Sequence, residues 1–210
     1  FPHLLQQIRF NQFDTIYHEH FSYLSLLAVK QIFSANGLKV FDVEKVPTHG
    51  GSLRVFAALA SSNWEIQQSV KSVLDEEIDA GLSSSEIYQS FDEKVRNTKW
   101  SLLELLIRLK REGKRIVGYG APAKGNTLLN YCGIGQDFID FTVDRSPQKQ
   151  GMYLPGTRLA IKAPEAIADV KPDYVLILPW NIKEEVMEQM SYIREWGGKF
   201  IVPIPHATVL

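Results

Sequence analysis

The feature that most constrains the fold is a strand, a glycine-rich loop and a helix that follow one another between residues 114 and 131. Residues 114–119 (KRIVGY) predict a short buried strand, and residues 120–125 (GAPAKG) predict a loop. Residues 126–131 begin a helix. A loop of this kind presents backbone N–H groups and the positive end of a helix to an anion. The segment therefore predicts an anion-binding site within an α/β unit.

The chain after this loop continues to alternate between strands and helices. Apolar runs predict three more strands, at residues 138–143, 173–178 and 199–202. Helical patterns between them cover residues 164–169 and 182–196. Such alternation predicts a parallel sheet, with ligands at the edge formed by the carboxyl ends of the strands. At this edge we expect residues 118–125, 144–146 and 179–181.

The first half of the chain has a different pattern. A helix over residues 25–36 precedes two strands, at residues 38–46 and 52–59, which we interpret as an antiparallel pair at the end of an α/β sheet. Two amphipathic helices follow, at residues 64–80 and 85–111. The predicted fold class is α/β: a Rossmann-like parallel-sheet domain preceded by a helical linker and the tail of a second α/β sheet. We place the three regions at residues 1–60, 61–112 and 113–210.

Composition excludes several classes of function. The formal charge is −1 and no basic run could follow a phosphate backbone, so nucleic acid is not expected as a partner. Cys132 is the only cysteine, which excludes an internal disulfide and a cysteine-based zinc module and indicates a reducing, cytoplasmic setting. Apolar runs such as residues 174–178 are far shorter than the roughly 20 residues that span a bilayer, so we expect no membrane segment. The chain begins at Phe1 without a methionine, and we expect a fragment of a longer protein.

The segment with the most chemically active side chains is residues 14–23 (DTIYHEHFSY). Histidine, with an unperturbed pKa of about 6.5, takes and returns protons near neutral pH, and a neighbouring carboxylate can fix its tautomer. This combination predicts an acid–base site, although a polar turn with solvated histidines has the same composition. A metal site is a third interpretation, because His18 and His20 point to one side of an extended segment. Two ligands without a nearby cysteine are too few for closed zinc coordination, and we predict no metal.

The glycine loop by itself leaves more than one function open. Residues 118–123 (GYGAPA) satisfy the pattern G-x-G-x-x-G/A, and Asp144 ends the next strand, as in a dinucleotide-binding domain. Lys124, beside the start of the helix, favours a diphosphate without indicating which nucleotide carries it. A glycine loop chosen only for a tight turn is a further possibility.

Three motifs in a fixed order carry a resemblance to a known family. They are residues 13–23 (FDTIYHEHFSY), 48–54 (THGGSLR) and 118–127 (GYGAPAKGNT). The chain resembles the C-terminal two thirds of the S-adenosylmethionine-dependent sugar C-methyltransferases, which methylate ring carbons of nucleotide-linked ketosugars. The resemblance implies that residues 1–60 end a cofactor domain and that residues 113–210 bind a nucleoside-diphosphate sugar. It also implies that an N-terminal zinc module and the main S-adenosylmethionine site lie outside this chain.

The same resemblance implies roles for individual residues. His20, with Tyr17 and Glu19 beside it, would remove a proton next to a keto group, and the resulting enolate would attack the methyl sulfonium. Two alternatives are an NAD-binding oxidoreductase domain and a non-catalytic module that binds sugar nucleotides. The expected substrate-binding residues are those of the glycine loop and three from the second motif: Gly120, Ala121, Pro122, Ala123, Lys124, Gly125, Asn126, His49, Ser52 and Arg54.

Overall fold

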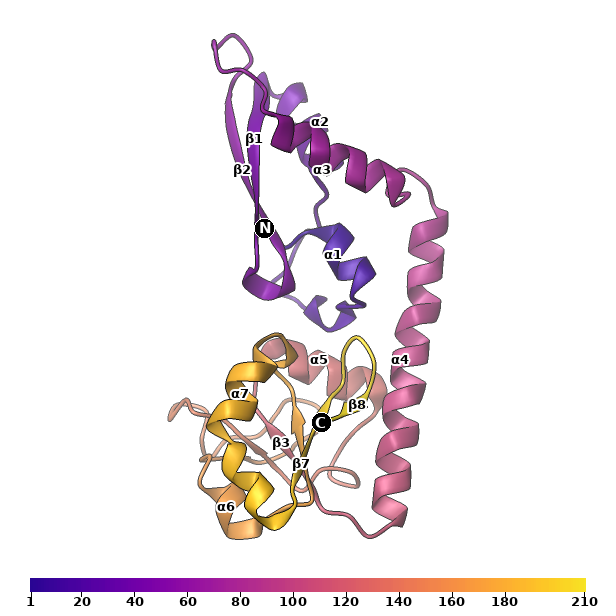
Figure 1. Ribbon diagram of the computed structural model, residues 1–210, viewed down its shortest axis with the longest axis vertical. Helices are drawn as coiled ribbons and strands as arrows, with labels where there is room; N and C mark the ends of the chain where they lie inside the picture. Colours follow the sequence, from indigo (N-terminus) through magenta and orange to yellow (C-terminus); the bar gives the residue numbers. More distant parts are fainter. The chain divides into compact units, whose positions relative to one another are not determined.

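The computed structural model describes residues 1–210, which form two compact units (Figure 1). Unit 1 consists of residues 1–12 and 19–94, and unit 2 consists of residues 13–18 and 95–210. Helix α4 (Glu86–Arg111) contributes residues to both units. The three-part division expected from the sequence stays a prediction.

Unit 1 is built around a two-stranded antiparallel sheet. Its strands are β1 (Leu38–Val46) and β2 (Ser52–Leu59), which pair from Leu38 opposite Leu59 to Val46 opposite Ser52, with a bulge after Val40. Val40 and Val43 of β1 and Leu53 of β2 are buried in one apolar cluster with residues of α2 (Leu26–Ala35) and α3 (Gln68–Asp79). Helix α1 (Leu4–Arg9) belongs to a second, smaller apolar cluster. The helix and two strands expected between residues 25 and 59 are confirmed.

One buried carboxylate organises the helices of unit 1. The side chain of Glu77 on α3 is fully buried, and its Oε1 accepts a hydrogen bond from the backbone N–H of Leu26 at 2.6 Å. Its Oε2 accepts from the N–H of Leu27 at 2.8 Å. The imidazole of His3, which precedes α1, lies 2.8 Å from Oε1 through Nε2. Glu77 therefore caps the first turn of α2 from another helix and ties it to the start of α1.

Replacing Glu77 by alanine is expected to destabilise unit 1 by about 3–5 kcal/mol, because the change leaves a buried imidazole and two buried N–H groups without their acceptor. Glu76 is the matched control on the same helix, since it pairs with Arg9 and Lys45 near the surface. Glu76→Ala should cost about 0–1 kcal/mol. Hydrogen exchange measured by mass spectrometry follows unit 1 separately. Equal loss of amide protection in the two variants would contradict this account.

Unit 2 contains a six-stranded, mostly parallel sheet. Its strand order is β5-β4-β3-β6-β7-β8, in which β8 alone runs antiparallel to its neighbour. Three helices connect the strands: α5 (Ala123–Cys132), α6 (Ala166–Val170) and α7 (Lys183–Gln189). The α/β fold class is confirmed. The strands are β3 (Ile116–Tyr119), β4 (Thr142–Val143), β5 (Ile161–Lys162), β6 (Tyr174–Ile177), β7 (Lys199–Val202) and β8 (Thr208–Val209).

Several elements of unit 2 differ from the sequence-based expectation. The strand expected at residues 138–143 is regular only at its end, because the N–H groups of Phe138 and Ile139 both bond to the carbonyl of Gly135 in a turn. The helix expected at residues 182–196 is α7 followed by a 3-10 helix, Ser191–Trp196, which buries Ile193. The two-residue strands β5 and β8 were not expected, since so short a strand leaves no periodic pattern. No helix of the structure is both long enough and apolar enough to cross a bilayer.

The connections of the sheet define one topological switch point. The chain passes from β3 to β4 and β5 in one direction and then returns to β6, which pairs with the other side of β3. In parallel α/β sheets the loops that leave two such strands separate and open a crevice at their carboxyl ends. Here the two loops begin at Gly120 and at Leu178.

Candidate functional site

A small cavity lies at this switch point. It measures about 190 Å³ and is lined by residues that follow β3, β4 and β6, among them Gly120, Asp144 and Pro179. The carboxyl edge of the sheet thus brings together the segments that the sequence placed there. The cavity is too small for a nucleotide, and it marks the place where the glycine loop meets the loop after β6.

Two glycines allow this close approach. Gly120 has a φ of +91°, and a Cβ atom on it would come within 2.6 Å of Cδ of Pro179. A Cβ atom on Gly125 would come within 2.7 Å of Cβ of Leu178. Both positions therefore exclude larger side chains, the first by backbone conformation and packing and the second by packing alone. As a result, α5 lies directly against the end of β6.

The backbone N–H groups of the loop are not equally available to a ligand. The N–H of Ala121 donates to Oδ2 of Asp144 at 2.7 Å, and Oδ1 of Asp144 accepts from the N–H of Ser146 at 2.9 Å. The carboxylate that would bind a ribose in a dinucleotide-binding domain is instead bonded to the backbone on both oxygens. This arrangement weighs against the NAD-binding alternative.

The first turn of α5 has backbone N–H groups that no acceptor inside the helix satisfies. The first backbone hydrogen bond of this helix runs from the N–H of Asn126 to the carbonyl of Pro122, at 3.1 Å. The N–H groups of Ala123, Lys124 and Gly125 therefore have no acceptor inside the helix, and Pro122 supplies no side-chain cap. Of the expected phosphate-binding loop, it is this first turn that presents donors.

The side chain of Lys124 projects from the first turn onto the loop after β6. Its Nζ donates to Oδ1 of Asn181 at 2.7 Å and lies 4.7 Å from the centre of the Trp180 ring. Burial lowers the pKa of Lys124, and the nearby charge of Asp14 works in the opposite direction. An ammonium group that has lost part of its hydration gains more from an anionic ligand than an exposed one does.

Asp14 is a functional candidate that the sequence analysis did not single out. It lies in a 3-10 turn, Phe13–Thr15, whose three residues are all buried in unit 2. Its side chain is fully buried, and its Oδ2 accepts a hydrogen bond from Nε1 of Trp180 at 2.6 Å. Burial raises the pKa of the Asp14 carboxyl from 3.8 to about 7, although the Trp180 hydrogen bond and the charge of Lys124 lower it. The sequence offered one hint of this site, because Trp180 lies two residues after a predicted strand, at the edge where ligands are expected.

The expected acid–base residues follow Asp14 closely in the chain. Tyr17 is half-buried and belongs to unit 2, together with His18. Glu19 is exposed and His20 is half-buried, and both belong to unit 1. The unit boundary therefore runs through the motif, between His18 and Glu19. The roles assigned to Tyr17, Glu19 and His20 stay predictions.

The three residues expected from the second motif gather at one groove of unit 1. His49, Ser52 and Arg54 all line a hollow of about 610 Å³ beside the turn between β1 and β2. The hydroxyl of Ser52 donates to the carbonyl of Thr48 at 2.9 Å, and Arg54 pairs with Glu44 at 2.9 Å. Their shared location agrees with a common function, and the substrate contacts stay predicted.

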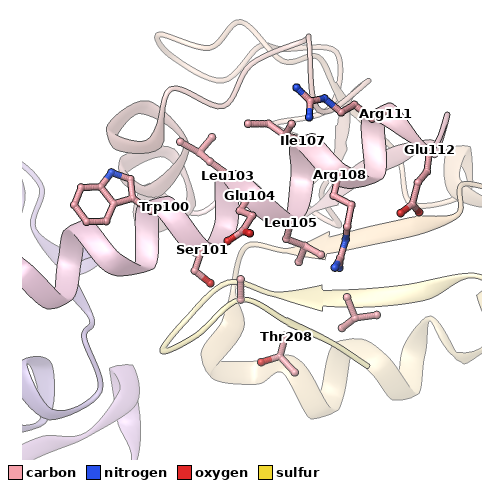
Figure 2. A pocket seen from close by; sticks show the side chains of 12 residues that line it. Trp100, Ser101, Leu103, Glu104, Leu105, Ile107, Arg108, Arg111, Glu112 and Thr208 are labelled. Atoms are coloured by element: carbon pink, nitrogen blue, oxygen red, sulfur yellow. The ribbon is translucent and has the colours of Figure 1, made fainter.

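Another hollow, along α4 and β8, measures about 1090 Å³ (Figure 2). Ser101, Leu105 and Arg108 point from α4 toward the segment that carries Thr208. None of the expected site residues lines it. We therefore place the candidate site at the glycine loop and not in the hollow along α4 and β8.

The raised pKa of Asp14 predicts a pH dependence of stability. Between pH 4 and 7 the folded carboxyl keeps its proton while the unfolded one has lost it, so the buried carboxyl destabilises unit 2 progressively as the pH rises toward about 7. Asp14→Asn removes this titration. The variant should therefore gain in free energy of unfolding relative to the wild type as the pH rises, by at most about 4 kcal/mol, and the difference should level off once the pH is well above the folded pKa of about 7. Urea unfolding of both proteins from pH 5 to 8 measures it, and a pH-independent difference would contradict the assignment.

Comparison with known proteins agrees with this architecture. A family model described as the C-methyltransferase C-terminal domain matches residues 47–205. The C-methyltransferase NovU of Streptomyces niveus is 42% identical over 209 residues, covering 100% of this chain and 50% of the relative. The chain thus spans about half the length of this curated relative. The resemblance inferred from the three motifs is confirmed, and the chain belongs to the C-methyltransferase family.

Proposed function

We propose that this chain supplies the substrate-binding and proton-transfer parts of an S-adenosylmethionine-dependent enzyme that C-methylates a nucleotide-linked ketosugar. The observation that carries the proposal is Lys124, a partly desolvated cation at the open start of α5, on the carboxyl edge of a Rossmann-like sheet. Membership in the C-methyltransferase family supports the reaction class. S-adenosylmethionine supplies the methyl group as an electrophilic sulfonium, and we assign its main site outside residues 1–210.

The phosphate site follows from the donors at the first turn of α5. A diphosphate placed there accepts from Lys124 and from the N–H groups of residues 123–125, where the helix dipole also favours negative charge. Ala121 contributes less through its N–H, because Asp144 already occupies that donor. The diphosphate of a sugar nucleotide carries the charge that this arrangement recognises.

Lys124→Ala should weaken binding of a nucleoside diphosphate by about 1.5–3 kcal/mol, or roughly tenfold to a hundredfold in Kd, because one charge-assisted contact is lost. Calorimetry with UDP and dTDP in separate titrations measures this loss. Lys99 is a matched control in the same unit, since it donates to the carbonyl of Tyr131 at 2.9 Å and lies 5.1 Å from the centre of that ring. Lys99→Ala should bind as the wild type does.

The result also separates the alternatives. An unchanged affinity of Lys124→Ala would move the phosphate away from α5. Selective binding of NAD with hydride exchange would favour an oxidoreductase and overturn the methyltransferase proposal. Diphosphate binding without any chemistry on the sugar in the complete enzyme would favour a non-catalytic module.

We assign the proton chemistry to residues 17–20 of the first motif. A keto group acidifies the neighbouring C–H bond, and His20 takes this proton as general base. The electron pair left on the ring carbon forms the new bond to the methyl group, and the carbon–sulfur bond breaks. Tyr17 donates a hydrogen bond to the oxygen of the enolate, and Glu19 orients the imidazole of His20. His49, Ser52 and Arg54 are also proposed to contact the sugar nucleotide.

His20→Asn should slow exchange of the substrate hydrogen with solvent deuterium by roughly 10²–10⁴-fold, because the variant lacks the titrating nitrogen of a general base. The complete enzyme is assayed with the ketosugar nucleotide and without methyl donor, so that the proton step is isolated. Tyr17→Phe should slow exchange by roughly 10²–10³-fold, the effect of losing one oxyanion hydrogen bond.

His18→Asn is the internal control for this assignment. The structure has a bend at Tyr17 and a turn at His18 and Glu19 where the sequence suggested an extended segment, and only the family resemblance selects between the two histidines. Exchange that survives in His20→Asn but is lost in His18→Asn would reverse the assignment and place the base two residues earlier.

A further inference from the structure

The turn that precedes Tyr17 is held on unit 2 by two different contacts. Phe13 packs against Tyr131, with ring centres 5.2 Å apart. Asp14 accepts the hydrogen bond from Trp180, a residue 166 positions later in the chain. The N–H of Ile16 donates to the carbonyl of Phe13 at 3.0 Å and extends the turn to within one residue of Tyr17. The backbone that leads into Tyr17 is therefore anchored to unit 2.

Trp180 contacts both this turn and the candidate phosphate site. Its indole N–H faces Asp14, while its ring faces the ammonium of Lys124. Asn181, the next residue, accepts from the same ammonium. A carboxyl, an indole and an ammonium thus lie in series, from the acid–base motif to the first turn of α5.

Packing alone does not account for a carboxyl at position 14. Phe13 already supplies apolar contact for the turn, and a fully buried carboxyl is costly compared with an apolar side chain of similar volume. Oδ1 of Asp14 bonds to no other side chain, so the hydrogen bond from Trp180 is what ties this carboxyl to a distant part of the chain. The carboxyl fixes the orientation of the turn, because a hydrogen bond has a preferred angle and ring packing is less directional.

We propose that Asp14 is a positioning residue for Tyr17: through its hydrogen bond with Trp180 it holds the turn Phe13–Thr15 on the unit whose Lys124 receives the substrate phosphate. The proposal rests on the function proposed above. It adds that one side chain, Trp180, positions both Lys124, which binds the phosphate, and the turn before Tyr17, which donates to the enolate oxygen. Asp14 acts through Tyr17 and does not contact the substrate.

Exchange of the substrate hydrogen with solvent deuterium tests this role. The complete enzyme is assayed without methyl donor. Asp14→Leu keeps a side chain branched at Cγ and removes the acceptor, whereas Trp180→Phe keeps a ring beneath Lys124 and removes the donor. Each should slow exchange roughly 10- to 100-fold, as expected for a misplaced catalytic group. Asp14→Asn retains an oxygen acceptor and should restore most of the rate. Affinity for UDP or dTDP, measured by calorimetry, should not change in Asp14→Leu.

A double-mutant cycle with Tyr17→Phe distinguishes positioning from general loss of structure. If Asp14 acts through Tyr17, Asp14→Leu should have little further effect on exchange in the Tyr17→Phe background, whereas damage to the unit as a whole would lower the rate again. Trp180→Phe gives the same comparison if Asp14→Leu does not fold. Additive effects, or a parallel loss of diphosphate affinity in Asp14→Leu, would overturn the positioning role.

Exchange by the wild-type enzyme distinguishes a failure of the proposed function from a failure of the role of Asp14 alone. A wild-type enzyme that exchanges no substrate hydrogen would overturn the proposed function and the role of Asp14 with it. Wild-type exchange together with an undiminished rate in Asp14→Leu and in Trp180→Phe would overturn the role of Asp14 alone. Failure of Asp14→Asn to restore the rate would also overturn it, because the hydrogen bond would then not be what matters.

Discussion

The architecture of unit 2 depends on the close approach of α5 to the end of β6. Gly125 leaves room for Leu178, and Gly120 leaves room for Pro179. Because no side chain separates the two segments, Lys124 on the first turn of α5 meets Trp180 and Asn181 on the loop after β6. The two glycines thus allow Lys124 to reach the contacts that place its ammonium in the candidate site.

Each unit buries a carboxylate, and the two are used differently. Glu77 receives two backbone N–H groups and lies beside the imidazole of His3, so both of its oxygens are bonded. Asp14 receives the indole N–H of Trp180, its Oδ1 bonds to no other side chain, and burial raises its pKa to about 7. A fully bonded buried carboxylate stabilises a packing arrangement, whereas a partly bonded one is a cost to stability of the kind that functional sites retain.

The glycine motif illustrates why a sequence pattern and a function are separate matters. Residues 118–123 fit a dinucleotide-binding pattern, and an acidic residue ends the following strand as that pattern requires. In the structure, however, Asp144 binds the backbone N–H groups of Ala121 and Ser146. Asp144 therefore occupies a backbone donor of the glycine loop instead of binding a ribose. The donors that remain are those of the first helical turn.

The sequence by itself determined the α/β class, the glycine loop at the carboxyl edge of the sheet and the three motifs that mark the family, because local periodicity and turn chemistry record which residues are buried. The two-residue strands β5 and β8 and the 3-10 turn at Phe13–Thr15 were beyond it, since such short elements leave no period to detect. The hydrogen bond between Asp14 and Trp180 was beyond it for another reason. Only the order of the strands brings the loop after β6 beside α5, so the partner of a buried carboxyl 166 positions away was decided by tertiary structure.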